Sequence, residues 1–156
     1  MNYYDSIAKS YNSLYMAEQL KKFENAKNLL GKGLTLDLGC GNGFITEKLG
    51  NAIGVDNSIG MLKLCDKNLK VIQADICNLP FKDKIFDSVF SLTALQDVED
   101  VSKAVSEIKR VLNPNGIIIL SVLNKKKISE IRILLNKNFK KLKEKENYND
   151  IIFFTQ

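Results

Sequence analysis

The segment of this sequence whose spacing most clearly suggests chemistry is a loop with three glycines at alternate positions. Its residues are Asp37-Leu38-Gly39-Cys40-Gly41-Asn42-Gly43. Glycines that follow a short apolar run let the backbone approach a nucleotide-like ligand closely. The spacing does not fit the dinucleotide fingerprint G-x-G-x-x-G, which would need a third glycine where Phe44 or Thr46 stands. We therefore predict a nucleotide-like ligand other than NAD at this loop.

Histidine is absent from the 156 residues, although it is the usual general base near neutral pH and the commonest metal ligand. Its absence excludes Ser-His-Asp triads, Cys-His dyads and histidine-based zinc sites. The three cysteines, Cys40, Cys65 and Cys77, include no C-x-x-C pair. This pattern favours reduced thiols in a cytoplasmic protein over disulfides or a thiolate metal site, and we expect no metal centre.

The segments around the glycine loop must position it. Apolar residues at roughly helical spacing, with no glycine or proline before Gly31, predict a helical segment over residues 1–30. Short apolar runs then alternate with helical patterns, and Asn113-Pro114-Asn115-Gly116 predicts a turn. The expected strands cover residues 34–38, 52–55, 69–73, 86–91, 117–123, 140–145 and 150–155, and the expected helices cover residues 44–49, 58–65, 101–112 and 127–135.

This order predicts an α/β protein with three layers, in which a doubly wound, mainly parallel, seven-stranded sheet ends in an antiparallel hairpin. The length and composition, 45% apolar and 26% charged, fit a single domain over residues 1–156, with an N-terminal segment 1–30 and a core 31–156. The N-terminus lacks the basic and apolar regions of a signal peptide, and no apolar run approaches the ~18 residues of a membrane span. We expect a cytoplasmic protein without membrane association.

Several motifs occur in the order found in one protein family. The acidic residue and alternate glycines are followed by Asp56 at the end of the second expected strand, and then by Gln73-Ala74-Asp75-Ile76 and Phe86-Asp87-Ser88-Val89-Phe90-Ser91. In this order the sequence resembles the class I S-adenosylmethionine-dependent methyltransferases, in particular small single-domain members of the type 11 kind. The resemblance covers almost the whole chain. It implies the Rossmann-like methyltransferase fold and S-adenosylmethionine as the cofactor.

The resemblance also implies roles for individual residues. Asp56 would receive the ribose hydroxyls, because a carboxylate offers several acceptor sites to a diol. Met61 would lie beside the adenine, Asp75 would accept from the exocyclic amine, and the backbone amide of Ile76 would donate to a ring nitrogen. The remaining implied cofactor contacts are Asp37, Gly39, Cys40, Gly41, Asn42, Gly43, Asn57, Ser91 and Tyr11. Tyr11 belongs to the part of residues 1–30 that resembles the family's helical lid over the cofactor.

Two positions leave open questions. Asp37 acts indirectly through the loop or binds the amino group of the cofactor, because an acidic side chain near a cationic ligand and backbone amides can do either. Asn115 stands where the family more usually has glycine. Since asparagine tolerates a left-handed backbone, we expect the turn at residues 113–116 to be kept.

Methyl transfer from a sulfonium is an in-line displacement to which positioning contributes much of the acceleration, so a histidine is not strictly required. An oxygen or a cationic amine acceptor must nevertheless lose a proton. Gln96, Asp97 and Glu99 follow the fourth expected strand, where related methyltransferases often carry histidine. We take Asp97 as the candidate catalytic base. The alternative role for Asp97, or for Asp100, is to cap the helix that begins near Val101.

The acceptor is constrained only in part. Ser91-Leu92-Thr93-Ala94 stands where methyltransferases of exocyclic base amines carry Asn/Asp-Pro-Pro-Tyr/Phe, and we expect a small-molecule acceptor. The net charge of +5 comes from residues 125–145, which hold nine basic residues against Glu130 and Glu144. An RNA or protein substrate docking on this basic C-terminal segment is therefore the second hypothesis. A non-catalytic cofactor-binding or regulatory protein is the third, and the sequence specifies no oligomeric state.

Overall fold

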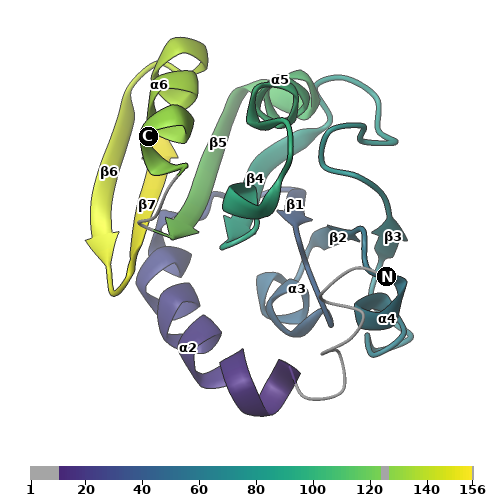
Figure 1. Ribbon diagram of the computed structural model, residues 1–156. Coiled ribbons are helices and arrows are strands. Elements are labelled where there is room, and N and C mark those ends of the chain that lie inside the picture. Colours follow the sequence, from purple (N-terminus) through teal and green to yellow (C-terminus); the bar gives the residue numbers. More distant parts are fainter. Residues whose placement is uncertain (1–10, 124–126, 156) are drawn as a thin grey trace.

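The computed structural model describes residues 11–123 and 127–155, with side chains from Tyr15 onward (Figure 1). Seven strands form one sheet in the order β3-β2-β1-β4-β5-β7-β6. The strands are β1 Thr35–Leu38, β2 Ala52–Asp56, β3 Val71–Gln73, β4 Phe86–Leu92, β5 Leu112–Leu123, β6 Leu142–Asn147 and β7 Asp150–Thr155. Strands β1 to β5 pair in parallel, and β7 pairs antiparallel with both β5 and β6. The predicted fold class and its C-terminal hairpin are confirmed.

Helices cover both faces of the sheet (Figure 1). They are α2 Tyr11–Ala26, α3 Phe44–Leu49, α4 Ile59–Leu62, α5 Val101–Val111 and α6 Ile128–Asn138, with short 3-10 helices at Lys27–Leu29 and Leu95–Asp97. Helices α5 and α6 contribute to one hydrophobic cluster, whereas α2 and α3 contribute to a second. Within the described ranges, none of these helices combines the length and the apolar character needed to cross a membrane.

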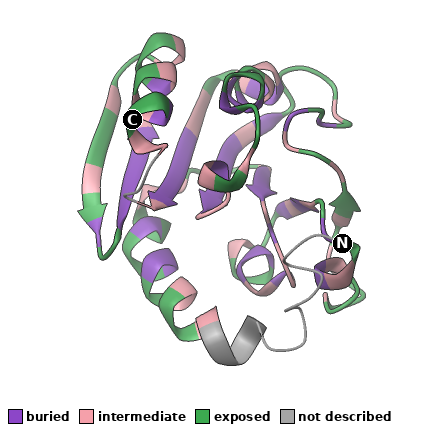
Figure 2. Cartoon of the chain, viewed as in Figure 1, coloured by how far each residue is buried: buried purple, intermediate pink, exposed green. Residues whose placement is uncertain are grey.

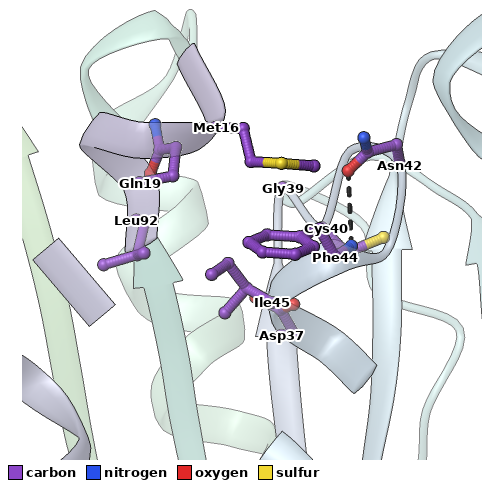
Figure 3. Close-up of a pocket in the computed structure, with 9 residues that line it drawn as sticks. All are labelled: Met16, Gln19, Asp37, Gly39, Cys40, Asn42, Phe44, Ile45 and Leu92. Atoms are coloured by element: carbon purple, nitrogen blue, oxygen red, sulfur yellow. Dashed lines mark hydrogen bonds between the residues drawn. The ribbon is translucent and has the colours of Figure 1, made fainter. Parts of the chain in front are cut away.

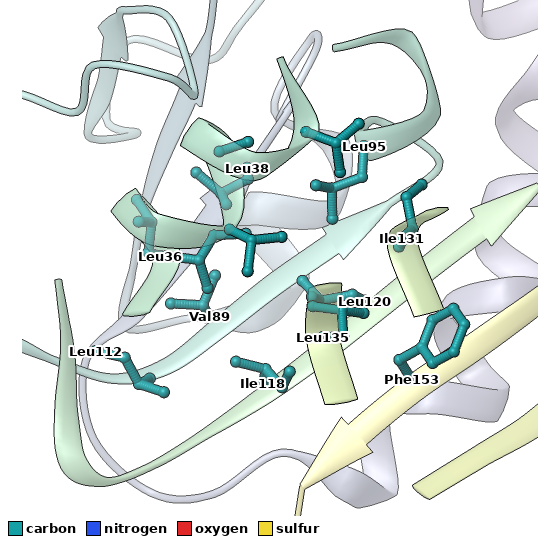
Figure 4. Close-up of a cluster of buried hydrophobic side chains, with 14 of the residues drawn as sticks. Leu36, Leu38, Val89, Leu95, Leu112, Ile118, Leu120, Ile131, Leu135 and Phe153 are labelled. Atoms are coloured by element: carbon teal, nitrogen blue, oxygen red, sulfur yellow. The ribbon is translucent and has the colours of Figure 1, made fainter. Parts of the chain in front are cut away.

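The alternation of side chains along the central strands produces the two clusters. On β5, Ile118 and Leu120 belong to the cluster under α5 and α6, while Ile119 between them belongs to the cluster under α2 and α3. Successive strand residues point to opposite faces, so a strand covered on both sides must be apolar without interruption. Figure 2 shows the buried central strands, and Figure 4 shows the first cluster, in which Leu135 of α6 and Phe153 of β7 take part.

Helix α5 confirms the predicted helical stripe over residues 101–112. Its buried residues are Val101, Ala104, Val105, Ile108 and Val111, which recur at the spacing of one helix face. The carboxylate of Asp100 caps the helix by accepting a hydrogen bond from the Lys103 amide at 2.9 Å. The sequence offered Asp97 and Asp100 as caps for this helix, and Asp100 is the residue that caps it.

The helix stop predicted at residues 113–116 is confirmed, but this segment forms an irregular part of β5 and not a separate connection. Helix α5 ends at Val111, and the chain enters β5 directly, with Leu112 opposite Phe86 and Ile117 opposite Ser88. The extra residues between these two pairs are accommodated by a shift of register, within which the Asn113 side chain accepts a hydrogen bond of 3.0 Å from the Asn115 amide, as in an Asx turn. Asn115 is not among the residues with positive φ, so the left-handed backbone expected there is not formed.

Several other boundaries differ from the sequence-based expectations. The helix expected over residues 58–65 is limited to Ile59–Leu62, and the strand expected over residues 69–73 begins at Val71. Strand β6 covers Leu142–Asn147 instead of residues 140–145, and α6 continues to Asn138. Of the segment expected to be helical over residues 1–30, residues 1–10 lie outside the described part of the chain.

Helix α2 is fixed to the C-terminal hairpin by buried polar contacts. The ammonium of Lys22, which is 1% exposed, lies 3.0 Å from a carboxylate oxygen of Asp150 on β7 and 2.6 Å from Glu18. The same Asp150 oxygen accepts a hydrogen bond of 2.6 Å from the hydroxyl of Ser121 on β5. One turn further along α2, Asn25 donates to the side chain of Asn147 at 2.8 Å. The helix therefore has a defined position over the sheet face.

Candidate functional site

The glycine loop lies at the carboxyl end of β1, in the middle of the sheet. A Cβ atom at Gly39 would come within 2.4 Å of the Ala94 side chain, and one at Gly41 within 3.0 Å of the Met61 methyl carbon. Both glycines also have positive φ, 71° and 56°, where side chains are strained. The alternate glycines thus let the loop backbone pass between the ends of β4 and helix α4. Their side-chain-free surface forms the wall of a cavity.

The larger of two adjoining cavities, of ≈ 330 Å³, extends from this loop along the ends of β2, β3 and β4. Its size is in the range of small-molecule sites. It is lined by Gly39, Gly41, Asp56, Asn57, Met61, Ala74, Asp75, Ile76, Cys77, Leu92, Thr93, Ala94, Asp97, Val98 and Glu99. Eight of the positions predicted to be functional, seven of them as cofactor contacts, line this one cavity.

Asp56 holds the loop and faces the cavity at the same time. Its Oδ2 accepts a hydrogen bond from the Gly41 amide at 2.8 Å, and its Oδ1 accepts one from the Ser58 amide at 2.8 Å. Each carboxylate oxygen can accept more than one hydrogen bond. These contacts fix the orientation of the carboxylate at the wall of the larger cavity.

The far end of the cavity has an apolar wall and a polar edge. Met61 is 1% exposed, and its amide is capped by the hydroxyl of Ser58 at 3.1 Å. Asp75 accepts from the Cys77 amide through Oδ1 at 2.8 Å. The Asp75 carboxylate also contacts the Cys77 thiol, and within the described residues the backbone N–H of Ile76 has no hydrogen-bond partner. One acceptor and one donor side by side match the edge of an adenine-like base.

The smaller cavity, of ≈ 30 Å³, lies between helix α2 and the glycine loop (Figure 3). It is lined by Met16, Gln19, Asp37, Gly39, Cys40, Asn42, Phe44, Ile45 and Leu92. Figure 3 shows Met16 above the Phe44 ring, with Gln19 and Leu92 on the side opposite Asn42. Gly39 and Leu92 also line the larger cavity, so the two cavities adjoin.

Asp37 is buried, and its Oδ2 accepts a hydrogen bond of 2.7 Å from the Thr46 hydroxyl on α3. Burial is the main reason that the pKa of Asp37 is raised to about 7; the nearby Asp56 carboxylate adds to the rise and the Thr46 bond opposes it. The contact with α3 supports an indirect role through the loop, and the place of Asp37 in the cavity lining supports direct binding. Both predicted roles remain open.

The other loop residues have mainly local contacts. Asn42 accepts from the Phe44 amide at 3.3 Å, which is the dashed line in Figure 3, and Gly43 is the residue that precedes α3. Burial raises the pKa of the Cys40 thiol, with the neighbouring Asp37 and Asp56 carboxylates adding to the rise. Cys40 is therefore a small, neutral lining residue.

Ser91 and Tyr11 are not placed with the other predicted site residues, whereas the candidate base Asp97 is. Ser91 is fully buried, and its hydroxyl donates to the Leu38 carbonyl at 2.9 Å, which directs it between strands β4 and β1. The side chain of Tyr11 lies outside the described residues. Asp97, the candidate base, lies at the end of the 3-10 helix Leu95–Asp97, is exposed, and lines the larger cavity.

Sequence reasoning missed the polar cluster around Thr93, directly after β4. Thr93 has φ 55°, which is unusual for a β-branched residue. Its hydroxyl accepts from Gln19 of α2 at 3.1 Å, its amide donates to the Ser121 carbonyl at 2.8 Å, and its carbonyl accepts from Gln96. No sequence signal reveals a left-handed threonine, but the helical spacing of Met16 and Gln19 could have indicated that one face of α2 approaches the loop.

Comparisons with known proteins agree with the motifs. Residues 36–120 match the model of a family described as methyltransferase domain. An uncharacterized protein of Methanocaldococcus jannaschii, MJ1252, is 37% identical over 147 residues, which cover 90% of this chain and 59% of that protein. The tRNA (carboxymethyluridine(34)-5-O)-methyltransferase of Arabidopsis thaliana is 32% identical over 125 residues, 76% of this chain and 31% of that enzyme. The chain thus spans about a third to three fifths of the length of these relatives.

Among solved structures, a Thermotoga maritima protein has the same fold, with a TM-score of 0.84 at 22% identity. The match covers 97% of this chain and 96% of the other. That protein is described as an S-adenosylmethionine-dependent methyltransferase and a possible histamine N-methyltransferase.

Proposed function

Since the chain belongs to the methyltransferase family matched by its residues 36–120 and has the class I S-adenosylmethionine-dependent fold, we propose that it transfers a methyl group from S-adenosylmethionine to a small acceptor. The observation that carries the proposal is the larger cavity, in which Asp56, Asp75 and the glycine loop meet. No other arrangement among the described residues combines the predicted motifs in this way.

The residues of the larger cavity fit the nucleoside part of this cofactor. Asp56, held by the Gly41 and Ser58 amides, would accept from the ribose hydroxyls. Met61 provides an apolar surface for the base, and Asp75 with the Ile76 amide would pair with its polar edge. When bound, S-adenosylmethionine supplies a methyl group on a sulfonium, which leaves as a neutral thioether.

In this proposal the protein positions the cofactor and the acceptor and removes a proton from the acceptor. Residues of the loop and of the β4 end, Gly39 and Leu92, line both cavities and would separate cofactor from acceptor. Asp97 is exposed and lines the larger cavity, so a proton taken from an acceptor could pass to solvent. We retain Asp97 as the candidate base. The three cysteines are free thiols, which is compatible with the proposed cytoplasmic location.

An RNA acceptor is the second candidate function. The relative from Arabidopsis is a tRNA methyltransferase by name, and exposed Lys140, Lys141 and Lys143 lie in or beside the edge strand β6. An acceptor that docks on these residues would bind in a strongly salt-dependent manner. The small-acceptor proposal instead rests on cavities that are lined by no lysine or arginine among the described residues.

Calorimetric titration with S-adenosylmethionine and S-adenosylhomocysteine tests the proposed function, with NAD as the comparison ligand. We expect micromolar binding of the first two and at least a tenfold loss of affinity in Asp56→Ala. Asp66→Ala is the matched control, because Asp66 is exposed beyond α4 and does not line either cavity. A folded protein that binds neither ligand, or an Asp56→Ala variant that binds as well as the control, would contradict the proposal.

A further inference from the structure

The carboxylate of Asp75 lies at the nucleoside end of the larger cavity, and its side chain is exposed. An exposed carboxylate changes rotamer and is hydrated on all sides unless neighbouring groups hold it. A carboxylate that can turn away discriminates weakly against a base that presents an acceptor in place of an amine. A preference for adenine therefore needs a group that fixes the orientation of Asp75.

Cys77 contacts this carboxylate through two of its own groups. Its backbone amide donates to Asp75 Oδ1 at 2.8 Å, and its thiol makes a further contact with the same carboxylate. Cys77 is 8% exposed and lines the larger cavity. Two contacts restrict the carboxylate more than one, because rotation of the side chain must break at least one of them.

The thiol is itself fixed against helix α5. Its sulfur lies 3.4 Å from the carbonyl oxygen of Asp100, the residue that caps this helix. Two residues further along the same loop, the Leu79 amide donates to Glu107 of α5 at 2.8 Å. Since one face of α5 is buried along its whole length, the loop that carries Asp75 and Cys77 has a rigid support.

The thiol keeps a hydrogen to donate at neutral pH. Burial raises the pKa of the Cys77 thiol, and the neighbouring Asp75 carboxylate adds to the rise. Both groups that the thiol contacts, the Asp75 carboxylate and the Asp100 carbonyl, are acceptors. Because a thiol is a weak donor, its effect on Asp75 is mainly one of direction.

We propose that Cys77 is a positioning residue for cofactor selectivity, whose amide and thiol orient the Asp75 carboxylate toward the exocyclic amine of adenine. This orientation sets the preference for adenine over a base that carries oxygen at the same place. The inference rests on the methyl-transfer function proposed above and adds to its cofactor site a residue that acts through Asp75.

The ratio of two dissociation constants tests this inference without activity. The ligands are S-adenosylhomocysteine and S-inosylhomocysteine, whose base has an oxygen in place of the exocyclic amine. By calorimetry we expect the wild-type protein to bind the adenine ligand at least tenfold more tightly. In Cys77→Ala, which removes the thiol and keeps the amide, this preference should fall about fivefold. Cys77→Ser, which restores a donor, should recover most of it.

A purely structural role of Cys77 predicts a different result. Loss of packing alone would weaken the binding of both ligands alike and leave their ratio unchanged. Cys65→Ala is the matched control, because the Cys65 thiol also lies against a backbone carbonyl, that of Gly41 at 3.5 Å, and lines neither cavity. Its ratio should equal that of the wild type. If Cys77→Ala does not fold, Cys77→Val fills the space without a donor, and the same fall is expected.

The outcomes separate this inference from the function on which it rests. If S-adenosylhomocysteine does not bind the folded wild-type protein, the proposed function itself fails. If it binds, but the wild type does not prefer adenine, or the alanine variant at position 77 keeps the preference of the control, the positioning role alone is overturned. A serine variant with as low a ratio as the alanine variant would overturn it as well.

Discussion

Replacing Asp37 by asparagine should make the protein more stable at neutral pH. The carboxyl group is buried, and desolvation raises its pKa from 3.8 to about 7. Asparagine has nearly the same shape and can still accept the hydrogen bond from Thr46. The substitution therefore removes the titration and keeps the packing.

The sign and size follow from proton linkage. Between pH 3.8 and pH 7 the folded protein holds a proton on Asp37 that the unfolded chain has lost, so the stability of the wild type falls as the pH rises. A shift of one pKa unit corresponds to about 1.4 kcal/mol. The free energy of unfolding of the wild type should therefore fall, relative to Asp37→Asn, by about 2 kcal/mol from pH 5 to pH 7. The difference should become constant above pH 8.

Urea denaturation of the ligand-free protein, followed by far-ultraviolet circular dichroism because the chain has no tryptophan, measures this difference. Glu47→Gln is the control, since Glu47 is exposed on α3 beyond the loop and its replacement should not change the pH profile. Parallel pH profiles for wild type and Asp37→Asn would refute the reasoning. They would mean that the carboxyl group is hydrated or is ionised at little cost in the folded protein.

Three further changes test other contacts. Lys22→Met should lower the free energy of unfolding by about 3–5 kcal/mol, because it leaves the buried Asp150 carboxylate without its cation. If urea denaturation shows a decrease of less than about 1 kcal/mol, water reaches the pair and the reasoning is wrong. Arg110→Ala should lower the free energy of unfolding by about 1–3 kcal/mol. It should also speed proteolysis of residues 78–84, because Arg110 donates hydrogen bonds to Glu107, Asp83 and two loop carbonyls. Unchanged cleavage rates would contradict this. Lys141→Gly should raise stability by about 0.5–1 kcal/mol, since Lys141 is exposed with φ 54°; a lower melting temperature would refute that account.

The fold was largely predictable because its strands and helices have strong, uninterrupted patterns. The apolar run over residues 117–123 and the stripe of α5 specify a doubly covered strand and the helix on it, independently of the rest of the chain. The junction between them was not predictable from local signals. Asn113-Pro114-Asn115-Gly116 has the composition of a turn and forms one Asn113–Asn115 contact of that kind, but the pairing of Leu112 with Phe86 makes the segment an irregular part of β5.

The candidate site was predictable where backbone chemistry dictates it. Glycines with positive φ and carboxylates at strand ends form a pattern that can be recognised in the sequence. The predicted residues Asp56, Asp75 and Met61 do line one cavity. The contact between Gln19 and Thr93 could not be predicted in this way. Their contact joins residues 74 positions apart, and it depends on how α2 is set against the sheet by the buried Lys22 and Asp150. Ser91 was predicted as a cofactor contact and is not one of the cavity residues. Its position in the strand did not indicate that its hydroxyl donates to the Leu38 carbonyl.

The place of β7 in the sheet has a consequence for synthesis of the protein. Residues 150–155 lie between β5 and β6, and all but Thr155 are buried. Until these residues have left the ribosome, β5 is an open edge, and Leu120 and Val122 lack their strand neighbours Phe153 and Ile151. A nascent or truncated chain that stops before residue 150 would present a long apolar strand to other chains. Productive folding therefore depends on a late step, and chaperone contact should be most prolonged just before that step.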